Sequence, residues 1–252
     1  MHTAAVEDYV KTIYKLQTQT ETVSTSALAE RTGTTAAAVT KMLKHLAHLH
    51  LVSYTPYHGV RLSPMGEKIA LEVIRHHRLL ELYLAQAMGY SWDQVDAEAE
   101  KLEHVISEEF EARIDTLLGH PQTCPHGDPI PAPDGTLVEE RLRTLGECQP
   151  GEVVAIARVK DTDAAVLRSL SARAMTLAAA VTVLSRDDVD HLLTIEVGDR
   201  QHVIGQALAT SVFVSALLTK SHTADVKPFE SMTGGRNRPA GLAPRKKKGG
   251  SE

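Results

Sequence analysis

The chain has 252 residues, of which 42% are hydrophobic and 23% are charged, and its formal net charge is −5 at pH 7. These values are ordinary for a globular protein and leave room for two domains or three small ones. No run is long and apolar enough for a transmembrane helix, and the N-terminus lacks the basic and apolar regions of a secretion signal. The two cysteines, Cys124 and Cys148, do not form a disulfide framework. We therefore expect a cytoplasmic protein without membrane contact.

The charge is distributed unevenly along the chain. Residues 1–65 carry six Lys or Arg against four Asp or Glu, whereas residues 66–140 carry five against sixteen. A mildly basic first segment suits an anionic partner, and an acidic second segment suits bound cations.

The first segment has the pattern of a winged helix-turn-helix. Apolar residues recur at helical spacing over 5–19, with Asp8 beside them. N-cap candidates precede a short helix over 27–31, which Gly33 ends, and a second cap at Thr34 or Thr35 begins a longer helix. Two β-prone runs within 51–62 surround a turn with Pro and Gly, as in a hairpin.

This arrangement favours DNA as the anionic partner. Tyr57, His58 and Arg61 lie where a wing contacts phosphates or a minor groove, and the second helix exposes Thr40 and Lys41. The alternative is that the helix pair is a plain packing unit. The wing and the cationic helix face favour double-stranded DNA.

The second segment predicts a helical platform. Ser63-Pro64 caps a long helix over 65–88 that Gly89 ends, and further helices are expected over 91–110 and 111–118. The long helix has enough apolar surface for a core and a partner chain. A homodimer formed here would bring two winged heads to one palindromic operator.

The predicted helix over 91–110 also carries an acidic motif. Glu100, Glu103 and His104 share one helical face, where two carboxylates and an imidazole repel one another unless a cation lies between them. Oxygen ligands with one nitrogen suit Mn(II) or Fe(II). His77 and Glu81 repeat the pattern at i and i+4, which strengthens this interpretation against that of a solvated acidic face.

The rest of the chain changes character twice. Residues 121–136 are rich in Pro and Gly and predict a linker, in which we interpret Cys124 and His126 as structural. From Val153 short β-type runs predict a small barrel with a helix near 164–170. The predicted domains are a winged head, a helical dimerisation and metal-binding domain, an SH3-like domain and a disordered basic tail, over residues 1–65, 66–140, 141–232 and 233–252.

Four ordered blocks resemble the diphtheria toxin repressor (DtxR/MntR) family: Glu7–Tyr14, His77–Glu81, Glu100–Val105 and Gly127–Pro131. The resemblance implies a mainly α fold with a C-terminal β domain, and metal-switched DNA binding by a repressor of metal-homeostasis genes such as those for metal transport.

The resemblance also implies which residues bind metal. The positions that match family ligands are Asp8, His77, Glu81, Glu100, Glu103 and His104, with Asp96 where the iron-sensing branch has an ancillary histidine. Carboxylates replace that branch's Met and Cys at Asp8 and Glu100, and hard oxygen ligands favour Mn(II). Lys11 departs from manganese sensors that carry Glu there. Asp163 matches a ligand of the C-terminal domain loosely.

On DNA, the resemblance points to the start of the second helix of the pair, namely Thr35, Ala37, Thr40 and Lys41. Asp8 lies on the head and the other ligands lie on the platform, so one ion is expected to fix the head for DNA binding. Three alternatives differ from this: an Fe(II)-responsive regulator, a metal buffer without a DNA role, and a metal-dependent hydrolase. The last is disfavoured because Glu100 replaces the first His of the inverted zinc-protease motif.

Overall fold

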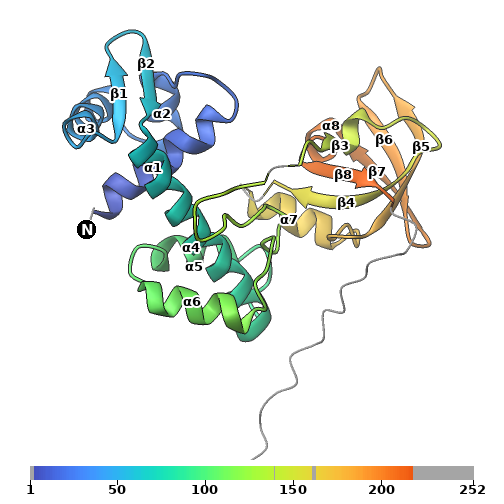
Figure 1. The fold of residues 1–252 in the computed structure, drawn as a ribbon. Coiled ribbons are helices and arrows are strands. Elements are labelled where there is room, and N and C mark those ends of the chain that lie inside the picture. Colours follow the sequence, from blue (N-terminus) through green and yellow to red (C-terminus); the bar gives the residue numbers. More distant parts are fainter. Residues whose placement is uncertain (1–2, 139, 161–162, 218–252) are drawn as a thin grey trace, which may run out of the picture. The chain divides into compact units, whose positions relative to one another are not determined.

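The structure is a computed structural model that describes residues 3–138, 140–160 and 163–217 (Figure 1). The predicted basic tail lies outside these residues. Within them, no helix is both long and apolar enough to cross a membrane.

The N-terminal part is the predicted winged helix-turn-helix. Its elements are α1 (Ala4–Gln17), α2 (Thr25–Thr32), α3 (Ala36–His48), β1 (Val52–Thr55) and β2 (Gly59–Leu62). The Ser24 hydroxyl caps α2 and the Thr35 hydroxyl caps α3, and between them Gly33 takes the left-handed conformation that ends α2. Strands β1 and β2 pair antiparallel. Fully buried side chains of α1, α2 and α3 make the core, among them Val10, Ile13, Leu28, Leu43 and Leu46.

The helical platform begins with α4 (Pro64–Met88), whose start and end agree with the prediction to within a residue. Ser63 caps α4, and Gly89 ends it with φ of 71°. The helix enters close to the wing, since a Cβ on Gly66 would lie 2.1 Å from the carbonyl oxygen of Leu51. Only a residue without a side chain fits at this contact.

The prediction of one continuous helix over 91–110 was wrong. The structure has α5 (Val95–Leu102) and α6 (Glu108–Leu117), with a turn between them. The Ser107 hydroxyl accepts the backbone N–H of Phe110 and begins the new helix, a local signal that the continuous acidic pattern concealed. Glu103 therefore caps α5, and His104 lies in the turn that follows.

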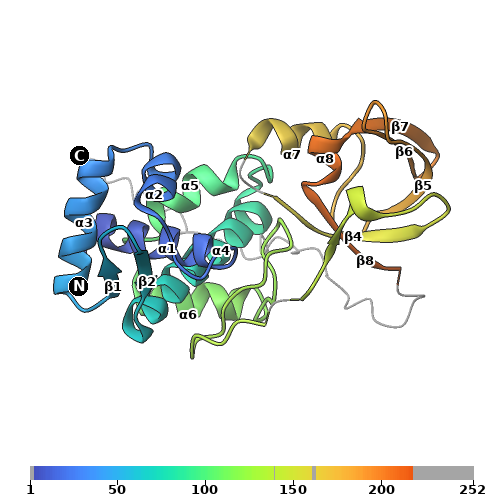
Figure 2. The same ribbon diagram turned by 90° about the horizontal axis from the view of Figure 1, so that it is seen from above.

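The C-terminal part is a curved antiparallel sheet in the order β3-β8-β4-β5-β6-β7, whose strands are labelled in Figure 1. Figure 2 shows β4 to β8 from a second direction. Its elements are β3 (Arg143–Thr144), β4 (Val153–Val159), α7 (Ala164–Ser171), β5 (Ala180–Asp187), β6 (Leu192–Val197), β7 (Arg200–Gly205), α8 (Gln206–Ala209) and β8 (Val212–Ala216), with a 3₁₀ turn at Leu145–Glu147. The prediction contained β4 to β7 and α7 but missed β3, α8 and β8. Strand β8 pairs with β4 and β3, so the missed strand lies inside the sheet.

Candidate metal centre

The start of α3 presents the predicted DNA-contacting residues. Ala37 and Lys41 are exposed, whereas Thr40 is half-buried and its hydroxyl donates to the carbonyl of Ala36 at 2.8 Å. Thr35 uses its hydroxyl as the helix cap and accepts the backbone N–H of Ala38 at 3.2 Å. Lys41 therefore has the only long, mobile cationic side chain among these four predicted contacts.

The two predicted DNA-contacting residues of the wing differ in their contacts. Tyr57 lies at the hairpin turn with its side chain fully exposed and φ of 67°. The guanidinium of Arg61 lies 2.6 Å from a carboxylate oxygen of Glu21. Because this pair is exposed, it costs little to break, and it does not prevent Arg61 from contacting a phosphate.

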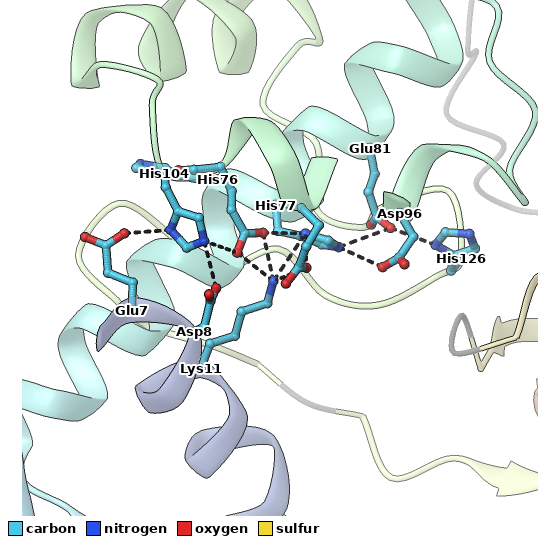
Figure 3. A network of polar contacts seen from close by, with 11 residues as sticks. Glu7, Asp8, Lys11, His76, His77, Glu81, Asp96, His104 and His126 are labelled. Atoms are coloured by element: carbon cyan, nitrogen blue, oxygen red, sulfur yellow. Dashed lines mark hydrogen bonds and ion pairs between the residues drawn. The ribbon is translucent and has the colours of Figure 1, made fainter. Parts of the chain in front are cut away.

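The first group of predicted ligands joins the head to the platform. Asp8 Oδ1, on α1, lies 2.8 Å from His104 Nε2, and Glu103 Oε1 lies 3.4 Å from the same nitrogen. The three ligand atoms lie within 4.8 Å of one another. Figure 3 shows Asp8 pointing toward His104. Glu7, which was not predicted, lies 2.7 Å from the other ring nitrogen of His104. A carboxylate at that nitrogen orients the ring, as it does for many metal-binding histidines.

Lys11 lies beside this group, among the carboxylates. Its Nζ donates to Glu100 Oε2 at 2.7 Å and to the two oxygens of Glu103 at 2.7 and 2.8 Å. Lys11 is only 4% exposed. Burial by itself lowers the pKa of Lys11, but the two carboxylates outweigh it and raise the pKa. The side chain is therefore a charged ammonium in the middle of the cluster.

His77 belongs to a second group of predicted ligands, with Glu100 and Glu103, and connects this group to Glu81 and Asp96. Its Nδ1 lies 2.5 Å from Glu103 Oε2, and its Nε2 lies 3.2 Å from Asp96 and 3.5 Å from Glu81. Burial lowers the pKa of His77, yet the surrounding Asp96, Glu103 and Glu81 carboxylates raise it to about 10. Without a bound ion, His77 is therefore protonated and supplies positive charge to the carboxylates.

A third group contains two residues that were interpreted as structural. Glu81, Cys124 and His126 are all buried, with ligand atoms within 4.8 Å of one another. His126 Nε2 donates to the carbonyl of Trp92 at 2.7 Å, which directs Nδ1 toward Glu81 Oε1 at 3.2 Å. The signal in the sequence was Cys-x-His in an extended segment, but Glu81, the third member, lies more than forty residues away.

Glu81 carries the strongest indication that a cation belongs here. Its side chain is 0% exposed. Among the described residues, neither of its oxygens has a hydrogen-bond donor in good geometry. Burial raises its pKa, but His126 and His77 outweigh burial and hold the pKa well below its usual range. Burial raises the pKa of the Cys124 thiol, so an ion bound there would displace a proton. The carboxylate, imidazole and thiol groups fit a divalent transition metal.

A buried hydrogen-bond network holds the backbone carbonyl of Glu103. His76 Nδ1 donates to the carbonyl of Glu103 at 3.1 Å, and its Nε2 lies 3.0 Å from Glu111 Oε2. Glu111 also accepts from Arg75 Nε at 2.5 Å, and Arg75 donates to the carbonyl of Pro131 at 2.8 Å. This network connects the ligand turn to α6 and to the Pro-rich segment.

Six of the seven predicted ligands lie in these three groups, namely Asp8, His77, Glu81, Glu100, Glu103 and His104, and the seventh, Asp96, contacts His77. Asp163 is not a member of these groups. Its carboxylate caps α7 by accepting the backbone N–H of Ala165 at 2.7 Å. Lys11 and Glu7 were not predicted as members, because their contacts join residues more than sixty positions apart and the family resemblance did not assign them as ligands.

Comparisons with known proteins agree with this architecture. Residues 1–60 match the N-terminal DNA binding domain of iron dependent repressors, residues 63–132 match their metal binding and dimerisation domain, and residues 143–216 match the FeoA domain. The iron-dependent repressor IdeR of Mycobacterium leprae is 32% identical over 157 residues, which cover 60% of this chain and 68% of that protein. The diphtheria toxin repressor of Corynebacterium diphtheriae is 32% identical over 128 residues, 51% of this chain and 57% of that protein.

Solved structures show the same fold. A manganese-dependent transcriptional repressor in complex with manganese superposes with a TM-score of 0.78 at 36% identity, covering 84% of this chain and 100% of that one. The structure of ScaR with bound Zn²⁺ gives a TM-score of 0.72 at 33% identity, covering 84% and 99%. These matches confirm the predicted winged helix, helical dimerisation domain and SH3-like domain. The chain therefore belongs to the diphtheria toxin repressor family, whose members are metal-dependent, DNA-binding transcriptional repressors and not enzymes.

Proposed function

We propose that this chain is a Mn(II)-responsive repressor that acts in the cytoplasm as a homodimer on a palindromic operator of metal-homeostasis genes. The single observation that carries the proposal is the junction of Asp8 with Glu103 and His104. Asp8 belongs to the DNA-binding head, whereas the other two follow α5 of the platform. An ion held by these three residues binds both parts at once.

The proposed switch is thermodynamic. Glu103 already has the Lys11 ammonium as a counter-charge, whereas Asp8 contacts the imidazole of His104. A divalent ion between Asp8 and Glu103 would add positive charge that attracts both carboxylates across the junction. An ion that fixes the head on the platform removes part of the entropy lost when two heads bind one operator. Such coupling is typically about 1–3 kcal/mol and is reciprocal, so operator DNA is expected to tighten ion binding by the same factor.

The metal preference follows from the ligand atoms. Asp8, Glu103 and His104 offer two hard carboxylates and one imidazole, a set that suits Mn(II) and Fe(II) better than softer ions. The manganese-dependent repressors among the similar structures support Mn(II). Fe(II) is the specific alternative, because Cys124 adds a softer ligand to the third group and the iron-dependent repressors are also similar.

The proposed dimer face lies on the platform. Side chains of α4, the turn after α5 and α6 line an apolar groove, and three of them are well exposed: Met88 by 58%, Val105 by 74% and Phe110 by 43%. Neighbouring exposed apolar groups of this kind are typical of protein interfaces. The match of residues 63–132 to a dimerisation domain supports a second copy of the chain as the occupant.

The proposal is tested by fluorescence anisotropy of labelled promoter fragments, with the wild type and Asp8→Ala compared in Mn(II) and in chelator. We expect Mn(II) to tighten binding of the wild type about 5- to 150-fold, which corresponds to the coupling energy above. We expect no response to Mn(II) from Asp8→Ala, and we expect its circular dichroism spectrum to match that of the wild type. Asp199→Ala is the matched control, because that exposed carboxylate lies in the turn between β6 and β7, outside the three groups. An equal Mn(II) response of Asp8→Ala and the wild type would contradict the proposed junction.

A further inference from the structure

Lys11 occupies one of the places where the carboxylate cluster is suited to a metal ion. Glu103 belongs to two groups at once, one with Asp8 and His104 and one with His77 and Glu100. The Lys11 ammonium lies in the second group, 2.7 Å from Glu100 Oε2, 2.7 and 2.8 Å from the oxygens of Glu103, and 3.4 Å from His77 Nδ1. Figure 3 shows the Lys11 side chain reaching from α1 toward His77.

Burial distinguishes Lys11 from an ordinary surface lysine. The Lys11 side chain is only 5% exposed and Glu103 is fully buried, whereas Lys101 on α5 is 69% exposed and pairs with Glu98 in the preceding turn. A buried ammonium is stable only where its charge is matched and its N–H groups are bonded. Lys11 meets both conditions through oxygens that an ion in the second group would also need.

We propose that Lys11 is a tethered cation that fills the second group, so that the Glu103 cluster binds a single divalent ion, at Asp8, Glu103 and His104. Glu100 then serves as a partner of Lys11. This inference rests on the proposed function and sets the number of ions that act at the junction. Lys11 also holds α1 on the platform without metal, because its Glu103 contact crosses the same boundary as the proposed ion.

Electrostatics explains why the ammonium and a second ion exclude each other. All three members of the second group contact Nζ, so a divalent ion there would have to take the place of the ammonium itself. The described contacts of Nζ do not include Asp8 or His104 of the first group. Nζ and Glu103 are buried, although Glu100 is half-exposed. Repulsion between two cations is weakly screened when the groups are buried. For a second ion to bind, the ammonium must leave its four contacts and move out of the second group.

The test counts ions bound to the full chain. Three proteins are dialysed against the same concentration of free Mn(II): the wild type, Lys11→Gln and Lys101→Gln. The number of Mn(II) ions bound per chain is then measured by inductively coupled plasma mass spectrometry. Lys11→Gln removes the cation but keeps a polar side chain, and we expect it to bind one more Mn(II) per chain than the wild type. Lys101→Gln removes the same charge outside the cluster and should match the wild type. Equal counts for wild type and Lys11→Gln would overturn the inference.

A second measurement needs only the wild type, in case Lys11→Gln does not fold. Lysine acetylation by a small reagent is followed by peptide mass spectrometry with and without saturating Mn(II), and Lys101 serves as the internal reference. We expect Lys11 to react at least ten-fold more slowly than Lys101 in both conditions. If Mn(II) makes Lys11 reactive, the ion displaces the ammonium and the inference is wrong. A wild type that binds no Mn(II) at all contradicts the proposed function, a result distinct from either outcome for Lys11.

Discussion

Replacing Glu103 by Gln tests the charge balance of the cluster in the metal-free protein. The Glu103 side chain is 0% exposed, and its carboxylate accepts from Lys11 at 2.7 and 2.8 Å and lies 2.5 Å from His77 Nδ1. Glu103→Gln leaves both cations buried without this counter-charge. Removing one partner of a buried pair costs about 3–5 kcal/mol. Because Glu100 still lies 2.7 Å from Lys11, we expect the lower end, about 3 kcal/mol of unfolding free energy.

The matched control is Glu100→Gln. Glu100 contacts the same ammonium at 2.7 Å, but its side chain is 52% exposed. Pairs open to water contribute about 0–1 kcal/mol, so we expect a loss in that range. The assay is urea unfolding in chelator at pH 7, followed by circular dichroism. Similar losses of unfolding free energy for Glu103→Gln and Glu100→Gln would refute the argument that burial makes the Lys11–Glu103 pair the stronger one.

Three further predictions concern other parts of the molecule. Burial raises the pKa of Glu111, but hydrogen bonds from His76 and a neighbouring arginine outweigh it and lower the pKa. We therefore expect the wild type to be about 2 kcal/mol more stable than Glu111→Gln near neutral pH. This difference should be present above the ordinary glutamate pKa and should disappear as the pH falls through the lowered pKa of Glu111. Urea unfolding of both proteins from pH 7 to pH 3 measures it. Gly66→Ala places a Cβ 2.1 Å from the carbonyl of Leu51, and should lower the unfolding free energy by about 1–3 kcal/mol, whereas an unchanged melting temperature would show that α4 shifts freely. Lys41→Ala should weaken operator binding and reduce the slope of log affinity against log salt by about 1; full affinity at moderate salt would exclude this contact.

Much of the fold was predictable because its helices carry local start and stop signals. Ser63-Pro64 and Gly89 determine the limits of α4, and Thr35 determines the start of α3, each through backbone hydrogen bonds or a left-handed turn at that position. The break before α6 was missed because acidic residues continue through it, and periodicity alone does not show a cap at Ser107.

The candidate site was predictable only where a motif or the family resemblance named its residues. Glu103 and His104 follow each other in the chain, so their proximity is local. The contacts of Lys11 with Glu103 and of His126 with Glu81 depend on how α1 and the Pro-rich segment pack on the platform. No spacing rule in the sequence encodes such a long-range contact, and consequently the ammonium in the cluster and the third group both came from the structure.

The central claim is that Mn(II) at the junction of head and platform switches DNA binding. The most direct measurement is the anisotropy of one operator fragment titrated with the wild type at fixed salt, in Mn(II), anaerobic Fe(II), Zn(II) and chelator at matched free concentrations. We predict tight, sequence-specific binding at a lower free concentration of Mn(II) than of the other ions, and weak binding in chelator. Binding that is the same in chelator and in every metal would contradict the switch.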